Sequence, residues 1–361
     1  MLIAIAITYI CTPIARLFAR HFDIYRPIRE RDVHNKPMPR LGGVAMYIGL
    51  CFAVVMAGQM PFLTDILAVN SQVWGVVQAA TILMVLGIAD DVLDLDWTLK
   101  LGGQILAAAI MTIQGTQLTS LPIGGIVLGS STMALVLTIL VVVTCINIMN
   151  FVDGLDGLAA GICAIGGVAF FIYSYLFSRH ATPDDYSNTA TLIIAITIGI
   201  CLGFLPHNFY KSKIFMGDTG AMLLGLLMAA SAITLTGQVD PTVISQTESL
   251  PIFMPLLLPV AIIAVPLFDM ISAIIRRTRA GMSPTSPDKM HLHHKMLNIG
   301  HSHVSAVLTL YTWTAVIAFG IVAFAFLPFW LVLIIDVAAV IGALHLTRNP
   351  KSIDKVAESV E

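Results

Sequence analysis

The feature that most constrains the fold is a series of eleven apolar runs. Short polar stretches separate most of them, and only Leu327–Pro328 divides the last two. Each run holds roughly 17–25 residues, the length of helix that crosses the hydrocarbon core of a bilayer. Hydrophobic residues make up 57% of the chain and charged residues only 11%, so an ordinary soluble domain is excluded. We therefore expect an all-α, polytopic integral membrane protein with about 11 transmembrane helices. The predicted spans are residues 1–20, 42–60, 73–90, 100–116, 131–150, 158–178, 189–206, 219–236, 252–275, 304–325 and 326–346.

The basic residues are distributed unevenly between the loops, and this distribution predicts the orientation. If the N-terminus is outside, Arg179 falls on the outer side and the other Lys and Arg residues fall in or beside cytoplasmic loops. Cytoplasmic loops carry such an excess of Lys and Arg. We therefore predict an outer N-terminus and a cytoplasmic C-terminus. Residues 1–361 are expected to form a single transmembrane domain, with a cytoplasmic loop near 276–303.

With this topology, four polar clusters lie on the cytoplasmic side. They are Ala89–Leu95, Asn147–Asp156, Lys211–Gly220 and Arg276–Lys295. The predicted outer loops contain acids, Ser and Thr but no comparable motif. Acidic and histidine-rich clusters that meet on one face suggest a single active site facing the cytosol.

The stretch CINIMNFVDGLDG joins two predicted spans and contains two amides and two carboxylates at steps of three residues: Asn147, Asn150, Asp153 and Asp156. Each step turns a side chain by about 60° on a helix, so Asn150 and Asp153 share a face. Two glycines in the stretch are poor helix residues. We expect the helix to loosen there, so that both Asp side chains reach one pocket. The alternative is a polar turn between two spans, where Asn, Asp and Gly are common.

Asp90 and Asp91 end the third predicted span, and Asp94 follows within about one helical turn. Two ionised carboxylates some 4 Å apart repel by about 4 kcal/mol at an effective dielectric constant of 20. Such a pair requires a counter-charge from Lys100, from the basic loops or from a divalent cation. One carboxylate with a raised pKa would instead serve as a base. The alternative is a set of polar residues that only ends a helix.

The stretch IFMGDTG places Asp218 between two glycines at the start of the eighth predicted span. One interpretation is a capped helix N-terminus, since Asp and Thr are favourable there. The other is a cation ligand beside glycines that let a diphosphate approach closely. Oxygen ligands without paired thiolates favour Mg²⁺, with Mn²⁺ as the second choice, over zinc.

The histidine-rich motif HLHH follows three arginines on the cytoplasmic side. The residues are His291, His293, His294, Arg276, Arg277 and Arg279. A zinc site would need a further ligand nearby and tetrahedral geometry, so contacts with a phosphate or a sugar fit better. Two acids lie within predicted spans: Asp269 is expected to pair with the basic end of its helix, and no role is predicted for Asp336.

Four motifs, ADDVLD, NFVDGLDG, FMGDTG and SPTSPDKMHLHHK, occur in this order on the predicted cytoplasmic side. Together they resemble the polyprenyl-phosphate N-acetylhexosamine-1-phosphate transferases of the glycosyltransferase 4 family. The likeness extends over essentially the whole chain, including the early HNKPMPRLGG. The HLHH form after SPDK is similar to the bacterial enzymes that transfer GlcNAc-1-phosphate, whereas the muramoyl-pentapeptide branch carries a different histidine run.

The resemblance implies a Mg²⁺-dependent transfer of GlcNAc-1-phosphate from UDP-GlcNAc to a membrane polyprenyl phosphate, undecaprenyl or decaprenyl. UMP would leave, and polyprenyl-diphospho-GlcNAc would begin a cell-envelope polysaccharide pathway. The resemblance also implies a bacterial plasma membrane location with the active site on the cytoplasmic face. The expected partners are UDP-GlcNAc, the prenyl lipid and the bilayer; no nucleic acid is expected, and a homodimer is left open.

The resemblance further implies roles for individual residues. Asp90, with Asp91 beside it, would deprotonate or position the lipid phosphate; since the second pKa of a phosphate ester is near 6, positioning is an alternative to activation. Asp218 and Asn150 would bind Mg²⁺. Lys100 and Asp153 would line the nucleotide pocket, with Phe215 stacked on uracil and Asp156 near the base. The residues expected to contact the diphosphate or sugar are His291, His293, His294, Arg276, Arg277 and Arg279.

Two other classes of protein share some of these features. A secondary transporter of an anionic substrate would place broken helices and polar residues near the midplane of the bilayer, often in repeated halves. An intramembrane aspartyl protease using Asp153 or Asp218 would hold its acids inside two facing spans. The polar motifs of this chain gather at one interface without an apparent repeat, which favours the transferase.

Overall fold

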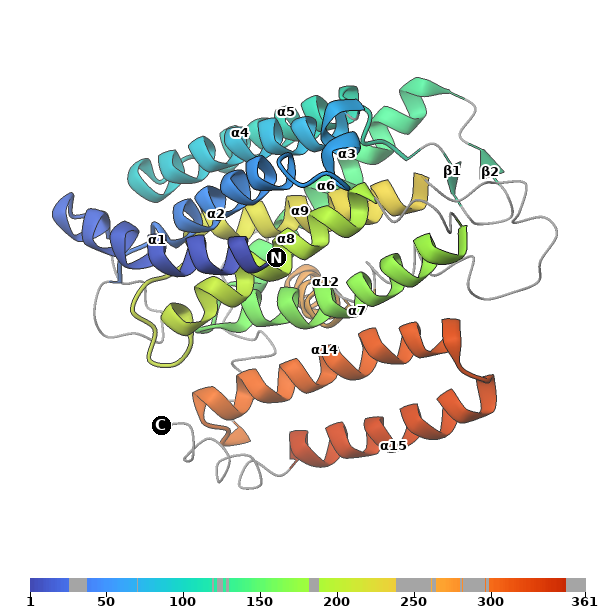
Figure 1. Cartoon of the computed structure of the whole chain (residues 1–361). Coiled ribbons are helices and arrows are strands. Elements are labelled where there is room, and N and C mark those ends of the chain that lie inside the picture. Colours follow the sequence, from blue (N-terminus) through green and yellow to red (C-terminus); the bar gives the residue numbers. More distant parts are fainter. Residues whose placement is uncertain are drawn as a thin grey trace.

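The computed structural model describes residues 1–25, 38–69, 71–118, 120–121, 126–127, 130–181, 188–237, 264–279 and 299–348, together with residues 261, 281 and 296. Within them the chain is almost entirely helical (Figure 1). The helices are α1 (Leu2–His21), α2 (Gly42–Ala57), α3 (Thr64–Val69), α4 (Ser71–Leu93), α5 (Trp97–Ile113), α6 (Ser131–Val152), α7 (Leu158–Ala181), α8 (Thr189–Asn208), α9 (Gly217–Gly237), α12 (Ala264–Arg279), α14 (His303–Phe326) and α15 (Phe329–Arg348). Two short strands, β1 (Ser120–Leu121) and β2 (Ile126–Val127), pair antiparallel between α5 and α6.

Eight of the described helices are long and apolar enough to cross a membrane: α1, α4, α6, α7, α8, α9, α14 and α15. Helices α2 and α5 are apolar but shorter. These helices coincide with predicted spans to within a few residues, and the last two spans form the α14–α15 hairpin seen at the bottom of Figure 1. The prediction of an all-α, polytopic membrane protein is confirmed.

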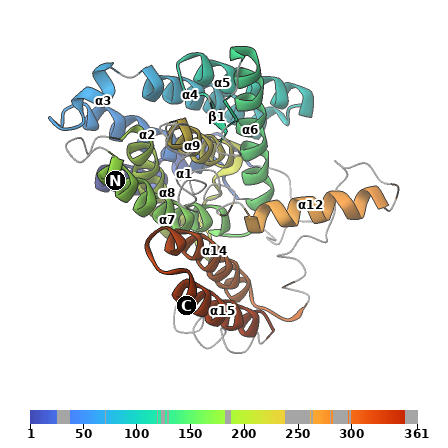
Figure 2. The same ribbon diagram turned by 90° about the vertical axis from the view of Figure 1, so that its right-hand side faces the viewer.

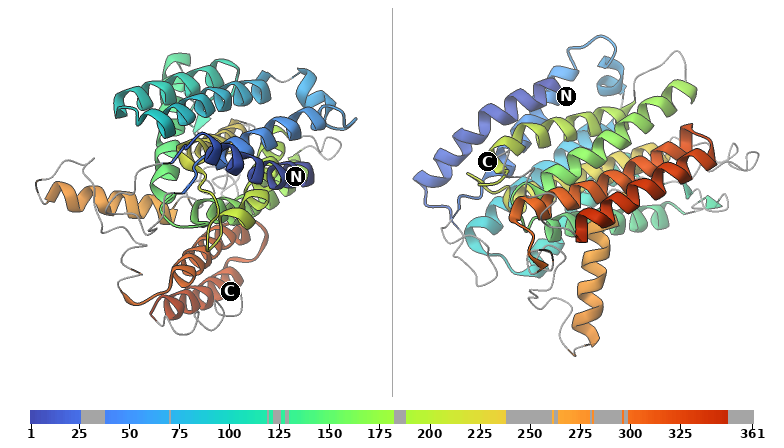
Figure 3. Two further views of the ribbon diagram at one scale, coloured as in Figure 1. Left: turned by 90° about the vertical axis from the view of Figure 1, so that its left-hand side faces the viewer. Right: turned by 90° about the horizontal axis from the view of Figure 1, so that it is seen from below.

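The ninth predicted span differs from the others. Of residues 252–275, the structure describes Ala261 and the part that belongs to α12. Figures 2 and 3 show α12 projecting sideways from the bundle instead of running along it. A helix of 16 residues is about 24 Å long, shorter than the roughly 30 Å hydrocarbon core, and the last turn of α12 contains three arginines. Helix α12 alone is therefore too short to cross the core, and most of the rest of the predicted span lies outside the described residues.

Helix α9 lies at the centre of the bundle, among α2, α4, α6 and α8 (Figure 2). Glycines allow this close packing. A Cβ added to Gly43 of α2 would lie 2.2 Å from the backbone nitrogen of Gly220, and one added to Gly225 would lie 2.5 Å from Cα of Ile146 in α6. Small residues at helix contacts let membrane helices approach closely. The first turn of α9, which contains Asp218, is thereby fixed against its neighbours.

Candidate active site

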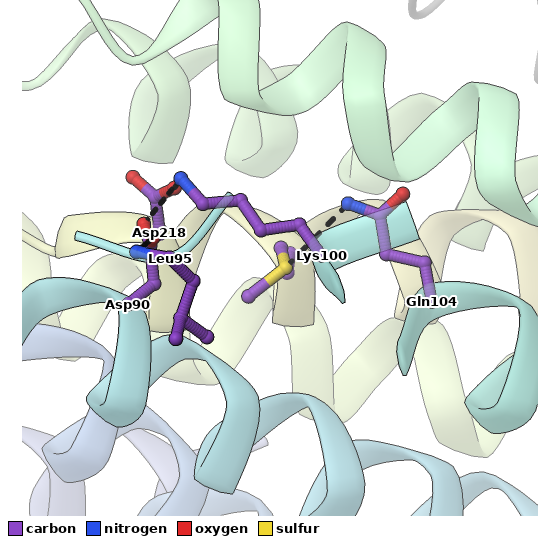
Figure 4. Close-up of polar contacts among 6 residues, drawn as sticks. Asp90, Leu95, Lys100, Gln104 and Asp218 are labelled. Carbon is purple, nitrogen blue, oxygen red and sulfur yellow. Dashed lines mark hydrogen bonds and ion pairs between the residues drawn. The ribbon is translucent and has the colours of Figure 1, made fainter. Parts of the chain in front are cut away.

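Lys100 joins two carboxylates that come from different helices (Figure 4). Its Nζ lies 2.6 Å from Oδ2 of Asp90, near the end of α4, and 3.3 Å from Oδ2 of Asp218, in the first turn of α9. The side chain of Asp90 is 2% exposed, whereas those of Lys100 and Asp218 are 22% and 19% exposed. A buried carboxylate requires a charged or hydrogen-bonding partner, and Lys100 supplies it from the first turn of α5.

The short connection between α4 and α5 sets this geometry. Asp94 directly follows α4 and has a φ of +49°. The backbone N–H of the next residue, Leu95, donates to Oδ1 of Asp90 at 3.0 Å. Asp96 then caps α5, because its carboxylate accepts a hydrogen bond from the backbone N–H of Thr98. Such a cap fixes where a helix begins, so Lys100 faces back toward the end of α4.

Asp91 is directed toward the start of α9. A Cβ added to Gly217, whose φ is +69°, would lie 2.5 Å from Oδ2 of Asp91. This oxygen is buried and has no hydrogen-bond partner among the described residues. Buried polar atoms are normally paired, so Oδ2 of Asp91 is an acceptor suited to a ligand that enters the site.

A short backbone pairing brings Arg40 into the same region. The N–H of Phe215 donates to the carbonyl that precedes Arg40 at 2.9 Å, and the N–H of Gly42 donates to the carbonyl of Phe215 at 3.1 Å. The guanidinium carbon of Arg40 lies 5.9 Å from the centroid of the Phe215 ring, within cation–π range. Arg40 also interacts electrostatically with the carboxylates of Asp91 and Asp153.

Asp153 connects the end of α6 to this cluster as the C-cap of that helix. Burial raises the pKa of Asp153 to about 7. The positive charge of Arg40 opposes this rise, and the charges of Asp218 and Asp156 add to it. Asn150 lies one turn earlier on α6. The end of α6 therefore faces the start of α9. We call the charged residues gathered here the carboxylate cluster: Asp90, Asp91, Lys100, Asp153, Arg40 and Asp218.

The turn after α6 is held by hydrogen bonds to its backbone. Gly157 has a φ of +76°, a conformation that favours glycine. Its N–H donates to Oδ1 of Asn208, at the end of α8, at 3.1 Å, and its carbonyl accepts a hydrogen bond from the hydroxyl of Tyr311, in α14, at 2.5 Å. Two distant helices therefore determine where this turn lies.

Asp156 is oriented by the segment between α8 and α9. Its Oδ2 accepts a hydrogen bond from the backbone N–H of Ser212 at 3.2 Å, and its own N–H donates to Nε2 of His303 at 3.2 Å. Helix α6 does end before the two aspartates, as the glycines predicted. Asp153 belongs to the carboxylate cluster, whereas the side chain of Asp156 is anchored to the α8–α9 segment.

Several site residues were not identified from the sequence: Gln104, Asn208, Ser212, His303 and Tyr311. Gln104 of α5 accepts a hydrogen bond from Nδ2 of Asn147 at 2.7 Å and lies 3.7 Å from the sulfur of Met222 in α9. These contacts join residues more than 40 positions apart. A polar side chain within an apolar run was their only signal, and it does not specify a partner.

The remaining predicted residues fall into three groups. His291, His293 and His294 are outside the described residues. Arg276, Arg277 and Arg279 form the last turn of α12, which also contains Asp269. Asp336 of α15 packs against α14, where a Cβ added to Gly320 would lie 2.7 Å from Oδ1 of Asp336. The predicted contacts of these residues, and that of Phe215 with uracil, stay predictions.

Comparison with known proteins identifies the family. The family model described as "Glycosyl transferase family 4" matches residues 73–236. The chain is 43% identical over 354 residues to a decaprenyl-phosphate N-acetylglucosaminephosphotransferase of Mycolicibacterium smegmatis, covering 97% of this chain and 87% of the relative. It is 30% identical over 339 residues to a probable undecaprenyl-phosphate N-acetylglucosaminyl 1-phosphate transferase of Bacillus subtilis, covering 92% and 86%.

A third relative extends the comparison to enterobacteria. The undecaprenyl-phosphate alpha-N-acetylglucosaminyl 1-phosphate transferase of Escherichia coli is 29% identical over 336 residues, covering 90% of this chain and 84% of the relative. The matches cover nearly the whole chain, and the family match includes the helices from α4 to α9 that carry Asp90, Lys100, Asp153 and Asp218. The chain therefore belongs to the polyprenyl-phosphate N-acetylhexosamine-1-phosphate transferases of glycosyl transferase family 4.

Proposed function

We propose that this protein transfers GlcNAc-1-phosphate from UDP-GlcNAc to a polyprenyl phosphate, undecaprenyl or decaprenyl. A phosphate oxygen of the lipid attacks the β-phosphorus of the nucleotide sugar. The bond from this phosphorus to the bridging oxygen breaks, UMP leaves with that oxygen, and polyprenyl-diphospho-GlcNAc remains. The names of the relatives, which are decaprenyl- and undecaprenyl-phosphate transferases of N-acetylglucosamine phosphate, support this assignment.

The observation that carries the proposal is the bridge from Lys100 to Asp90 and Asp218 at one end of a membrane bundle. The reaction joins a donor from water to an acceptor whose tail stays in lipid, so it requires charged groups at the end of the spans. Phosphoryl transfer depends mainly on positioning and on neutralising phosphate charge. The carboxylate of Asp90 and the ammonium of Lys100 are in contact, and the guanidinium of Arg40 acts electrostatically on Asp91 and Asp153. Together these groups provide both.

Lys100 and Asp90 have complementary roles in this proposal. The ammonium of Lys100 has three N–H donors, so one remains for a phosphate oxygen beyond the contacts with Asp90 and Asp218. Asp90, held by Lys100 and by a backbone N–H, orients the Lys100 ammonium toward the phosphates. A prenyl phosphate is largely ionised at pH 7, so Asp90 positions the nucleophile and need not deprotonate it.

Mg²⁺ is the proposed cofactor. Asp218 and Asn150, the ligands implied by the resemblance, would hold it together with Asp91. The buried, unpartnered oxygen of Asp91 fits this role. Proteins usually bind Mg²⁺ through one or two carboxylates plus substrate phosphates. Bound there, Mg²⁺ would neutralise the charge that develops on the diphosphate.

The proposed location is the bacterial plasma membrane, with the carboxylate cluster on the cytoplasmic side. The excess of Lys and Arg in the loops on this side supports the orientation. A secondary transporter would place its charged residues near the midplane. Asp90, Lys100 and Asp218 instead lie at the ends of α4, α5 and α9, which disfavours transport.

Release of UMP tests the proposal directly. The purified full-length protein in detergent is given UDP-GlcNAc, with and without undecaprenyl phosphate and Mg²⁺. We expect UMP only when both are present, and a lipid product with the mass of polyprenyl-diphospho-GlcNAc. A panel with UDP-GalNAc and UDP-MurNAc-pentapeptide, analysed by product mass, defines the sugar. No UMP release with any of these donors, although the protein is folded, would contradict the proposed activity.

A further inference from the structure

A second pocket lies outside the carboxylate cluster, between α1 and α8. It is a pocket of ≈ 180 Å³, and its lining residues are Thr12, Pro13, Arg16, His207, Lys213 and Ile214. Two of them are cationic and a third, His207, is titratable, whereas none is acidic. This volume is below the roughly 300–1,000 Å³ of pockets that enclose drug-sized ligands. The pocket therefore fits a small anionic group and not a whole nucleotide sugar.

Pro13 explains why His207 is fixed in one wall. Proline lacks the N–H that would bond to the carbonyl four residues earlier, so the carbonyl of Tyr9 loses its partner within α1. His207 of α8 takes this place, with Nε2 3.1 Å from the oxygen of Tyr9 and the two rings 4.8 Å apart. A carbonyl can only accept, so Nε2 carries the proton. The carbonyl of His207 in turn accepts from the N–H of Lys213 at 2.9 Å.

Arg16 provides an unsatisfied donor in the same pocket. Its Nε is shielded from solvent and has no hydrogen-bond partner within the described part of the chain. A buried donor left unpaired is unfavourable. An anionic oxygen in the pocket would satisfy Arg16 and balance Lys213.

The surroundings indicate where this anion comes from. On the same helix, Tyr9, Ile10 and Leu17 are exposed, as expected of side chains that face acyl chains. Arg16 lies in the last part of α1, at the end of the bundle that contains the carboxylate cluster. Basic pockets between helices at this level suit the headgroups of anionic lipids.

We propose that this pocket binds the phosphate of an anionic phospholipid from the inner leaflet, a lipid distinct from the acceptor. Lys213 and Ile214 belong to the segment between α8 and α9, and the next residues of that segment lead through Phe215 to Asp218. The phospholipid contacts one side of this segment and the carboxylate cluster lies at its other end. The proposal does not depend on the transferase reaction.

Lipid binding to the full-length protein in detergent, measured by native mass spectrometry, tests the pocket. The arms are phosphatidylglycerol, phosphatidylcholine and undecaprenyl phosphate, each titrated against the wild type and against Arg16→Gln/Lys213→Gln. The matched control is Arg20→Gln/Lys211→Gln, which removes the same charge from exposed positions on the same two elements. Lys213→Gln alone is the second test variant, because the side chain of Lys213 is exposed. Thermal unfolding checks that each variant is folded.

We expect the wild type to prefer phosphatidylglycerol over phosphatidylcholine. The pocket variant should lose roughly tenfold or more in phosphatidylglycerol affinity, and Lys213→Gln about fivefold, from the contribution of each basic residue to an anionic lipid. The control and the binding of undecaprenyl phosphate should stay unchanged. Equal losses in the pocket variant and the control would overturn the proposal, because they indicate unspecific attraction. Selective loss of undecaprenyl phosphate would also overturn it, because the pocket would then serve the acceptor.

Discussion

Helices α9 and α15 are apolar and nearly equal in length, with 21 and 20 residues, but their environments are opposite. Of an 18-residue apolar window, 94% is buried in α9 and 11% in α15, although α15 has the higher mean hydropathy. The difference lies in the contacts. A Cβ on Gly225 of α9 would meet the backbone of α6, whereas one on Gly342 of α15 would meet nothing within 4 Å. Close contact through small residues, and not hydrophobicity, selects the central helix.

Each of these helices also carries one carboxylate, and the two carboxylates differ in the same way. Asp218 of α9 meets Lys100 at 3.3 Å, whereas Asp336 of α15 packs against Gly320. Both residues attract attention in the sequence because acids are rare in spans. Only the packing of the helix shows which one takes part in a polar site.

The largest expected effect separates these two carboxylates. Asp218→Asn should lower kcat for UMP release by roughly 10²–10³-fold, because the loss of a group that stabilises transition-state charge costs about this much. Asp336→Asn is the matched control and should stay within about twofold, since changes away from such sites are small. The rates are measured under saturating UDP-GlcNAc and Mg²⁺. Equal losses in the two variants would break the comparison.

A second pair of variants tests the role of small residues. Gly225→Ala should destabilise the protein by about 1–3 kcal/mol, the usual cost of overpacking, because its Cβ would lie 2.5 Å from Cα of Ile146. Gly342→Ala should change stability by no more than about 0.5 kcal/mol. Thermal unfolding in one detergent provides both values. A neutral Gly225→Ala would show that α9 is not as closely packed as described.

A smaller effect is expected where α14 contacts the turn after α6. Tyr311→Phe removes the hydroxyl that donates to the carbonyl of Gly157 and should reduce kcat/KM about tenfold, since an unpaired buried acceptor costs at least 1 kcal/mol. Tyr175→Phe, at an exposed position of α7, is the control. Unchanged kinetics of Tyr311→Phe would mean that the turn keeps its position without α14.

The smallest expected effect concerns pH. Burial raises the pKa of Asp153 to about 7, above its unfolded value near 4, so the folded state binds more protons between these values. Stability should therefore fall as pH rises from about 4 through 7. Asp153→Asn should make this fall shallower, which thermal unfolding across that range measures. An identical pH profile in the variant would show that the pKa of Asp153 is not raised in the folded protein.

The sequence was sufficient for features that depend on local composition. Apolar runs predicted the spans, and the glycines after Asn150 predicted the end of α6. It also indicated Asp90, Lys100 and Asp218 as charged groups on one face. It named Lys100 as one candidate counter-charge for Asp90 and Asp91. It did not predict the contact of Lys100 with Asp218, because this depends on the glycine contacts that bring α9 against α2 and α6.

The residues that the sequence did not reveal share a physical reason. Arg40 reaches the carboxylate cluster through a backbone pairing with Phe215, and His303 reaches Asp156 from 147 positions away. No local pattern encodes either contact. Of the predicted ninth span, the described α12 covers the last part and ends in arginines, and most of the rest lies outside the described residues.

The most direct test of the central claim is a double-mutant cycle on UMP release. The claim is that Asp90 and Lys100 act as one unit, consistent with their 2.6 Å contact. We expect Asp90→Asn and Lys100→Gln each to lose most activity, and the double variant to be scarcely worse than the weaker single variant, as groups that act together are strongly non-additive. Losses that multiply, or wild-type turnover by Lys100→Gln, would contradict a reaction centre built on this ion pair.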